Sequence, residues 1–211
     1  FVGKVDDTYT AQAMIMTDMD NNQITAFHPG AMMQAHRNRV ESSVAHDIRI
    51  GIVAPDGREA MLAHAREFHA AGIPFVFDPG QGLPMFSGEE LRHFVDLASW
   101  VTVNDYEGRM LCERTGLDCA QLSMRVRGLV VTLGAAGCEV WEAGSKTLVP
   151  SAPPKQVVDP TGCGDAWRGA LLFGLEQGWP LARCAALGNR MGALKVASRG
   201  PQNYQLDFVP E

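Results

Sequence analysis

A short glycine-rich segment carries the clearest chemical signal in this chain. Residues 159–165 have the sequence DPTGCGD and lie between an extended stretch and an apolar segment typical of a helix. Glycine lets the backbone approach a ligand closely and adopt conformations that are closed to other residues. We expect the amides from Gly162 to Asp165 at a helix N-terminus, where unpaired N–H donors and partial positive charge favour an anion such as phosphate.

The carboxylate of Asp165 falls in the first turn of this predicted helix, beside the anion site. There it could accept a proton from a substrate hydroxyl while the amides hold a transferring phosphoryl group. The alternative is a glycine turn before a helix, with the carboxylate complementing the helix dipole, and the segment alone favours this alternative. The segment is not a P-loop, because no Gly-Lys-Ser/Thr follows, and it comes too late in the chain for a dinucleotide fingerprint.

The composition limits the class of protein. The chain has 211 residues, of which 46% are hydrophobic and 20% charged, which is typical of a globular protein with one domain and a small appendage. A net charge of −6 disfavours nucleic-acid binding, and no apolar run approaches the roughly 20 residues of a membrane span. The five cysteines are odd in number and form no CxxC pair, which favours reduced thiols in the cytoplasm.

Apolar segments alternate with helical patterns through the middle of the chain. Strands are predicted at 48–54, 74–78, 100–104 and 128–133, and helices at 57–71, 87–98, 105–114 and 118–126. Such alternation implies βαβ units and a parallel sheet that is covered on both faces. Two more strands are predicted at 138–142 and 146–149, followed by helices at 165–177 and 181–197.

The first part of the chain does not fit this alternation. Residues 11–17 and 23–27 have strand patterns on either side of an Asp/Asn-rich turn at 18–22. This arrangement predicts a β-hairpin. We expect the hairpin to form a small sheet separate from the main one.

The glycine-rich segment also resembles a family signature. Residues 159–165 resemble the second signature of the ribokinase-like (PfkB) carbohydrate and nucleoside kinases, which is Asp-Thr-x-Gly-Ala-Gly-Asp. This chain departs from it with Pro160 at the second position and Cys163 in place of Ala. Cysteine is small enough to fit there.

Two further segments resemble the same family and occur in the same order. Residues 104–107, Asn-Asp-Tyr-Glu, are similar to its Asn-x-x-Glu element, which organises Mg²⁺ and phosphates. Residues 131–134 together with Gly137 are similar to its nucleotide-binding strand and turn. The three linked motifs cover about residues 47–201 and make the functional interpretation of the glycine turn the preferred one.

The resemblance implies an α/β fold, a three-layer α/β/α sandwich with a mostly parallel central sheet and a small β-sheet lid. It assigns the lid to residues 8–33, a remnant of the N-terminal core to residues 1–7, and the nucleotide-binding core to residues 34–211. The family's initial strand and Gly-Gly substrate region, and a helix and strand after Val5, have no counterpart here. We expect that these segments were either deleted naturally or omitted from this sequence.

The resemblance implies transfer of the γ-phosphoryl group of ATP to an acceptor hydroxyl, with Asp165 as the base. The anion hole is assigned to the amides of Gly162, Cys163 and Gly164. Asn104 and Glu107 would hold Mg²⁺, largely through water, because this cation dehydrates reluctantly. The structural alternative is that Asn104 ends a strand and Glu107 is a solvated acid in the first turn of a helix.

Other positions match the family's nucleotide and cation sites. The ATP pocket is assigned to Thr132, Gly134, Gly137, Asn189 and Gly192. Close packing of the last helix is an equally good explanation for Asn189 and Gly192. Asp159 and Thr161 match positions that hold a monovalent cation in several members, so K⁺ is a possible cofactor.

The hairpin region and residues 77–81 resemble the bacterial and archaeal branch of adenosine or nucleoside kinases. This similarity implies that the acceptor is the 5′-hydroxyl of a nucleoside of the adenosine or inosine type. Substrate contacts in the lid are assigned to Thr10, Gln12 and Gln23. The expected partners are ATP and a nucleoside or sugar, and an exposed lid sheet could also pair with a second copy to form a homodimer.

Two alternatives to a nucleoside kinase stay open. The first is a sugar or sugar-phosphate kinase of the same family, acting on ribose or fructose. The second is a catalytically incomplete protein that binds a nucleotide or nucleoside. Of the residues beside the signature, Trp167 is predicted to lie in the core, and Arg168, which could reach a phosphate or face solvent, is not assigned to the site.

Overall fold

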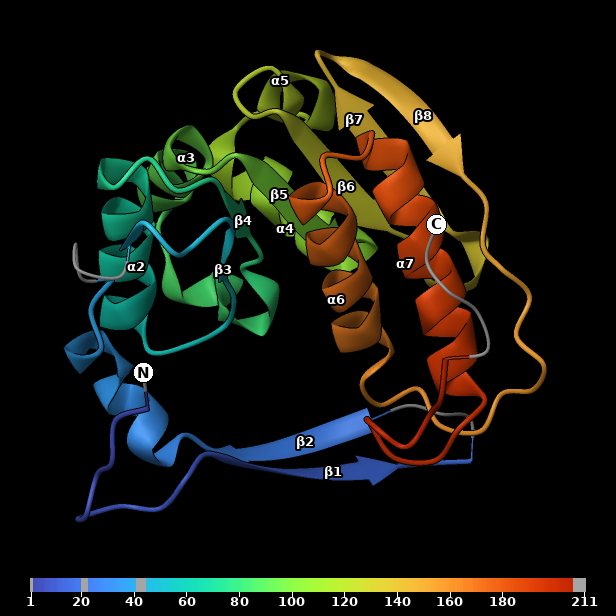
Figure 1. The fold of residues 1–211 in the computed structure, drawn as a ribbon, viewed down its shortest axis with the longest axis horizontal. Coiled ribbons are helices and arrows are strands. Elements are labelled where there is room, and N and C mark those ends of the chain that lie inside the picture. Colours follow the sequence, from blue (N-terminus) through green and yellow to red (C-terminus); the bar gives the residue numbers. More distant parts are fainter. Residues whose placement is uncertain (1, 20–22, 41–44, 207–211) are drawn as a thin grey trace.

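The computed structural model describes residues 2–19, 23–40 and 45–206. Within these residues the chain forms a six-stranded sheet, helices that cover it, and a separate two-stranded sheet (Figure 1). No helix in these ranges is long and apolar enough to cross a bilayer.

The strands of the large sheet lie side by side in the order in which they occur in the chain. They are β3 (Gly51–Val53), β4 (Phe75–Phe77), β5 (Trp100–Asn104), β6 (Gly128–Thr132), β7 (Cys138–Glu142) and β8 (Ser145–Val149). Strands β3 to β6 are parallel, whereas β7 and β8 add to the edge in antiparallel pairs. The short turn after β6 explains the change, because only an antiparallel pair can be joined without a crossover.

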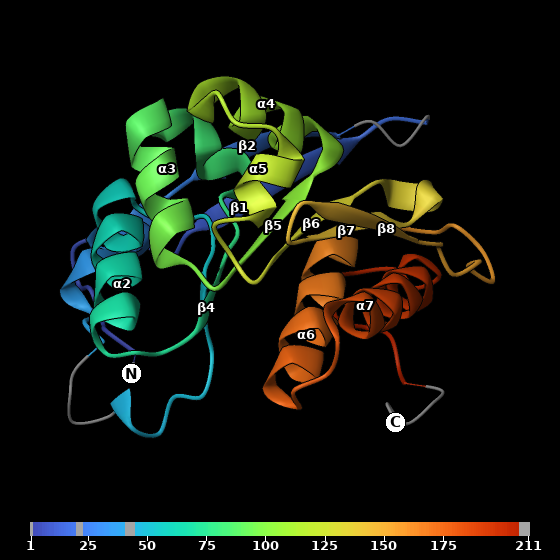
Figure 2. The same ribbon diagram turned by 90° about the horizontal axis from the view of Figure 1, so that it is seen from above.

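Helices cover both faces of this sheet (Figure 2). One face carries α2 (Arg58–Ala70), α3 (Gly88–Leu97), α4 (Asp105–Thr115) and α5 (Cys119–Ser123), and the other carries α6 (Cys163–Glu176) and α7 (Leu181–Val196). The predicted three-layer α/β/α arrangement with a mostly parallel sheet is therefore confirmed. The division into a lid and a core domain at fixed residue numbers stays a prediction.

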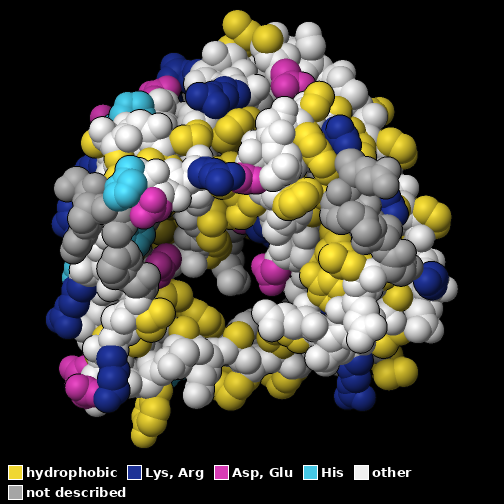
Figure 3. All heavy atoms as spheres, viewed as in Figure 1, with side chains coloured by type: hydrophobic (Ala, Val, Ile, Leu, Met, Phe, Trp, Pro, Cys, Tyr) yellow, Lys and Arg dark blue, Asp and Glu magenta, His cyan; other side chains and the backbone are white. Residues whose placement is uncertain are grey.

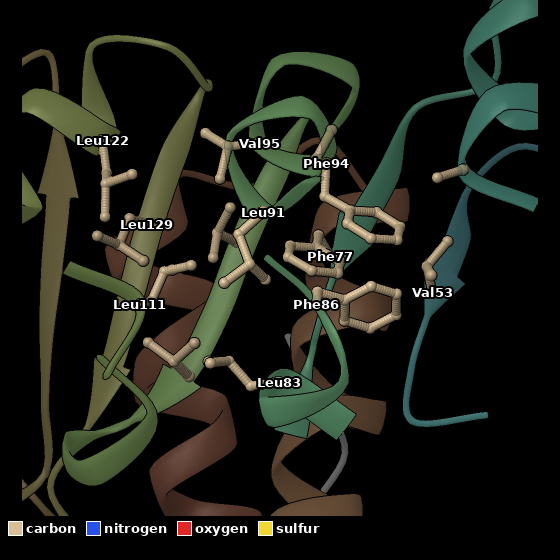
Figure 4. Close-up of a cluster of buried hydrophobic side chains, with 14 of the residues drawn as sticks. Val53, Phe77, Leu83, Phe86, Leu91, Phe94, Val95, Leu111, Leu122 and Leu129 are labelled. Carbon is tan, nitrogen blue, oxygen red and sulfur yellow. The ribbon is translucent and has the colours of Figure 1, made fainter. Parts of the chain in front are cut away.

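A cluster of aromatic and aliphatic side chains fills the space between the sheet and α2–α5 (Figure 4). Phe77 of β4 stacks on Phe94 of α3 with ring centroids 4.5 Å apart, and Phe86 meets Phe94 edge-on at 4.9 Å. A second cluster joins the opposite face to α6 and α7 and contains Trp167, as predicted. These two clusters fix the positions of the strand ends and of the start of α6.

Local signals located most elements to within a few residues. Capping boxes at Ser87 and Asp118 begin α3 and α5, at the first residues of the ranges 87–98 and 118–126 that were predicted as helices. Two 3-10 helices, η1 (Gly30–Arg37) and η2 (Gly80–Met85), were not predicted. η2 contains Pro84 and begins at a glycine, residues that argue against a helix in a sequence pattern.

The predicted hairpin is present as β1 (Gln12–Thr17) and β2 (Gln23–His28), which pair antiparallel from Gln12↔His28 to Thr17↔Gln23. Part of the predicted turn, residues 20–22, lies outside the described residues. At the base of the hairpin, the Ala31 amide donates to the carbonyl of Tyr9 at 2.8 Å. Every residue of β1 is exposed, so pairing with a second copy through this sheet stays a prediction.

Candidate active site

The start of α6 has the open backbone geometry that the glycine-rich segment predicts. Gly162 precedes the helix with φ of +84°, and a Cβ on it would lie 2.8 Å from Cβ of Pro201. No side chain in the described part of the chain caps this end. The first-turn amides of an α-helix lack intrahelical acceptors, and they carry the positive end of the helix dipole. This end can therefore bind an anion.

One member of the predicted anion hole has a different role in this conformation. The amide of Cys163 donates to the carbonyl of Pro160 at 3.1 Å, within the turn itself. This bond leaves the amides of Gly164 and Asp165 as the better-placed donors for a phosphate. Burial raises the pKa of the Cys163 thiol, so it stays protonated and packs as a small apolar group.

Asp165 is exposed in the first turn of α6. Burial raises the pKa of Asp78, and the charge of Asp165 adds a smaller contribution in the same direction. The pKa of Arg168 is raised against the effect of its partial burial, chiefly by Asp78, with a smaller contribution from Asp165. The predicted base therefore lies near an ion pair rather than alone at a helix end.

That ion pair joins α6 to the end of β4. Asp78, which is only 1% exposed, follows β4 directly and accepts hydrogen bonds from Nε and Nη2 of Arg168. Gly164 leaves room for the guanidinium, because a Cβ there would lie 2.5 Å from Nη1 of Arg168. Burial raises the pKa of Asp78, and the hydrogen bonds from Arg168 oppose that rise.

Asn104 and Glu107 form a capping box at the start of α4. The amide of Asn104 donates to Oε2 of Glu107, and the amide of Glu107 donates to Oδ1 of Asn104, both at 2.8 Å. Glu107 is half-buried, and desolvation raises the pKa of its carboxyl. The box uses one carboxylate oxygen of Glu107, so Oε1 has no partner among the described residues and can accept a hydrogen bond from a water.

These oxygen donors suit Mg²⁺, which keeps several of its waters when bound. In the described part of the chain, no three His, Cys, Asp or Glu side chains come together as a direct metal site. The residues therefore fit Mg²⁺ held through water and substrate phosphates, with Glu107 and Asn104 behind the water shell.

The predicted ATP-binding residues lie around the turn after β6. Thr132 ends β6, and its Oγ1 donates to the carbonyl of Val103 at 3.4 Å. Gly134 and Gly137 both have positive φ, and a Cβ on Gly137 would lie 2.2 Å from the carbonyl oxygen of Val149. Glycine is thus required for the turn itself, and contact with ATP stays a prediction.

Asn189 on α7 is buried and has its hydrogen bonds inside the protein. Its Oδ1 accepts from Nε1 of Trp167 at 3.0 Å, and its Nδ2 donates to the carbonyls of Val149 and Pro150 at 3.3 and 2.9 Å. This placement favours the packing explanation for Asn189 over a contact with adenine. Gly192 lies beside the start of α6, where a Cβ would be 3.9 Å from the carbonyl oxygen of Cys163.

The carboxylate of Asp159 organises the turn before α6. It accepts hydrogen bonds from the amide of Gly200 at 2.8 Å and from the amide of Thr161 at 2.9 Å. These bonds lower the pKa of Asp159 to about 2, so it stays ionised at neutral pH.

A cavity of about 490 Å³ separates the hairpin from this turn. It is lined by Ala13, Ile15 and Thr17 of β1 and by residues 158–161 and Arg199. Figure 3 shows the molecule hollowed between the hairpin and the core. A substrate held here would lie between the lid and the start of α6.

The lid residues predicted to contact the substrate are not among the described residues that line this cavity. Gln12 belongs to the opposite face of β1, because side chains alternate along a strand, and Thr10 precedes the strand. Neither lines the cavity, and the side chain of Gln23 lies outside the described part of the structure. Ala13, Ile15 and Thr17, which no motif identified, are the residues of β1 that line it.

Asp78 follows β4, Asn104 ends β5 and Thr132 ends β6, so these three lie at the carboxyl ends of neighbouring parallel strands. The charges of Asp165 and Glu107 both interact with Asp78, which places these two predicted residues near the same carboxylate. A family model, pfkB family carbohydrate kinase, matches residues 1–207 of the chain. The chain belongs to the pfkB family of carbohydrate kinases. Its resemblance to ribokinase-like kinases is therefore confirmed.

Relatives of this pfkB-family chain include nucleoside kinases. The one from Methanocaldococcus jannaschii is 30% identical over 193 residues, which are 92% of this chain and 63% of that protein. The one from Methanothermobacter thermautotrophicus is 28% identical over 200 residues, with 94% and 64% covered. The structure of Burkholderia thailandensis nucleoside kinase in complex with inosine matches with a TM-score of 0.89 at 49% identity, covering 94% of this chain and 64% of that one. The chain thus spans just under two thirds of the length of these relatives.

Sequence patterns did not identify Asp78 and Arg168 as part of this pfkB-family site. A usable signal existed for Asp78, since an acid directly after a buried parallel strand lies at the edge where α/β proteins bind ligands. No sequence pattern could show that Arg168 pairs with Asp78, because the two residues are 90 positions apart in the chain.

Proposed function

We propose that the protein is an ATP-dependent kinase that transfers the γ-phosphoryl group to the 5′-hydroxyl of a nucleoside of the adenosine or inosine type. The observation that carries this proposal is the open start of α6, with Asp165 in its first turn. The nucleoside kinases among the relatives support the acceptor class, and a related chain is described in complex with ADP-inosine.

Each step has a residue or backbone group to perform it. Asp165 accepts the proton of the acceptor hydroxyl, whose oxygen then forms a bond to the γ-phosphorus. The bond from that phosphorus to the bridging oxygen breaks, and ADP leaves. The amides at the start of α6 stabilise the negative charge on the γ-phosphate oxygens, which is the main requirement of phosphoryl transfer. Asn104 and Glu107 would hold Mg²⁺ through its bound waters, and the ion would neutralise phosphate charge.

A panel of acceptors tests the proposal. Adenosine, inosine, cytidine, ribose, fructose and fructose phosphates are each incubated with ATP and Mg²⁺, and ADP formation and the product are measured. We expect phosphorylation of nucleosides at the 5′ position. Products from ribose or fructose alone would instead support the sugar-kinase alternative. Nucleotide binding without any product would support the binding-protein alternative.

The role of Asn104 can be separated from its capping function. Asn104→Ala and Ser87→Ala each remove an N-cap within a capping box, so each should cost about 1 kcal/mol of stability. Only Asn104→Ala should also raise the Mg²⁺ concentration for half-maximal activity, by about tenfold. Urea unfolding and Mg²⁺ titrations of both variants check this. Equal Mg²⁺ requirements in the two variants would leave Asn104 with a capping role alone.

A further inference from the structure

Lys195, in the last turn of α7, is a buried cation in the site region. Its side chain is 0% exposed. Its Nζ donates to the carbonyl oxygens of Asp159 at 2.7 Å and Ser198 at 3.3 Å, and lies 3.8 Å from Oδ2 of Asp159. Burying a charge is costly unless it is paired and hydrogen-bonded. The ammonium is therefore held in place by specific partners.

The ammonium lies where the segment of residues 158–159 is hydrogen-bonded to a second segment, residues 196–200, which continues from the end of α7. The amides of Val158 and Asp159 donate to the carbonyl of Val196 at 2.8 and 3.1 Å, and Gly200 donates to the carboxylate of Asp159 at 2.8 Å. The second segment continues to Pro201, which packs against Gly162 at the start of α6. These contacts centre on Asp159, and Lys195 binds the carbonyl of the same residue, so the ammonium lies within the contacts that position the anion-binding turn.

Asp159, which Lys195 contacts, is one of the two residues to which the family resemblance assigns a monovalent cation, the other being Thr161. The two carboxylate oxygens of Asp159 accept hydrogen bonds from Thr161 and Gly200, and its carbonyl oxygen accepts one from Lys195. A K⁺ ion binds through oxygen ligands such as backbone carbonyls. Here those oxygens already have donors, and a second cation would be repelled by the ammonium. The residues present do not fit K⁺ at this position.

We propose that the Lys195 ammonium takes the place of a monovalent cation, holding the turn before α6 in its anion-binding shape without K⁺. This inference rests on the proposed kinase function for its activity measurements. Lys195 is a positioning residue, since it acts through the turn of residues 159–162 and not on the reacting atoms.

The substitution Lys195→Met distinguishes a cation supplied by the lysine side chain from a bound K⁺ ion. Lys195→Met keeps an unbranched chain but removes the charge, and leaves the Asp159 and Ser198 carbonyls beside the Asp159 carboxylate without a cation. K⁺ or NH₄⁺ should then bind there, which the wild type excludes. Lys146→Met is the matched control, because Lys146 is a partly exposed cation on β8 paired with Glu139.

The test uses the intact protein in tetramethylammonium buffer, with KCl or NH₄Cl added at constant ionic strength. We expect the kcat of the wild type and of Lys146→Met to change less than twofold with K⁺. Without K⁺, the kcat of Lys195→Met should be well below that of these two proteins. Adding K⁺ or NH₄⁺ should raise the kcat of this variant by at least about tenfold, because the bound ion stabilises the active shape of the turn. Independently of activity, K⁺ should raise the Tm of Lys195→Met by about 3–6 °C more than that of the wild type.

Strong K⁺ activation of the wild type would overturn the proposal without any variant. So would a folded Lys195→Met variant whose kcat and Tm both ignore K⁺ and NH₄⁺. If no acceptor is phosphorylated by any of the proteins, the proposed kinase function fails. The Tm measurements then still decide whether Lys195 stands in for a bound cation.

Discussion

Replacing Asp165 with Asn should lower kcat by about 10³-fold, within the range of general-base catalysis, while ATP binding stays close to that of the wild type. The amide has nearly the shape of the carboxylate but cannot accept the proton of the acceptor hydroxyl. The backbone amides at the start of α6 are unchanged, so the phosphate site should remain. Steady-state kinetics and calorimetry with ATP measure the two effects separately.

The control is Glu89→Gln, which removes a negative charge from the first turn of α3, outside the site. It should leave kcat unchanged, which separates loss of a base from loss of a charge that complements a helix dipole. An Asp165→Asn protein with kcat within threefold of the wild type would exclude Asp165 as the base. Loss of ATP binding in that variant would assign the residue to the anion site instead.

Replacing Arg168 with Met should destabilise the protein by about 3 kcal/mol, because it leaves the carboxylate of Asp78 buried without its partner. Asp78 is 1% exposed, so in the wild type its carboxylate has Arg168 rather than bulk water as its partner. The surface pair of Arg125 and Asp96 offers the control, with side chains 42% and 49% exposed. Arg125→Met should cost under about 1 kcal/mol, as exposed pairs do. Urea unfolding at neutral pH measures both variants.

The cost of Arg168→Met should also depend on pH. Burial already raises the pKa of Asp78, and losing Arg168 removes an interaction that lowers it. A carboxyl whose pKa is higher in the folded state binds more protons there, so stability falls as pH rises from its unfolded value towards its folded one. The double variant Asp78→Asn/Arg168→Met has no group to ionise at this position.

The stability difference between the single and double variants should therefore be smallest near pH 4 and grow towards pH 7. Unfolding curves at a series of pH values measure this difference. A difference that stays constant across the series would mean that the buried Asp78 carboxyl does not titrate between pH 4 and pH 7 in the Arg168→Met variant, contrary to this prediction.

Local interactions explain why much of this protein could be predicted from its sequence. The capping box at Ser87 involves residues three positions apart, and the strand at 100–104 is recognisable as a buried apolar run. The turn at Gly162 needs a positive φ that glycine adopts without strain, so its composition identifies it. The motif at 104–107 has the spacing of a capping box, and the structure forms one.

The sequence by itself thus determined the order of the elements, the family and the segment that starts α6, because each depends on neighbours along the chain. Only the tertiary structure decided how charges are paired around that segment. Arg168 bonds to Asp78 across 90 residues, and Lys195 to Asp159 across 36. Whether a cation faces solvent, a phosphate or a buried carboxylate depends on packing between elements that are distant in the chain. Local sequence patterns therefore do not predict these pairings.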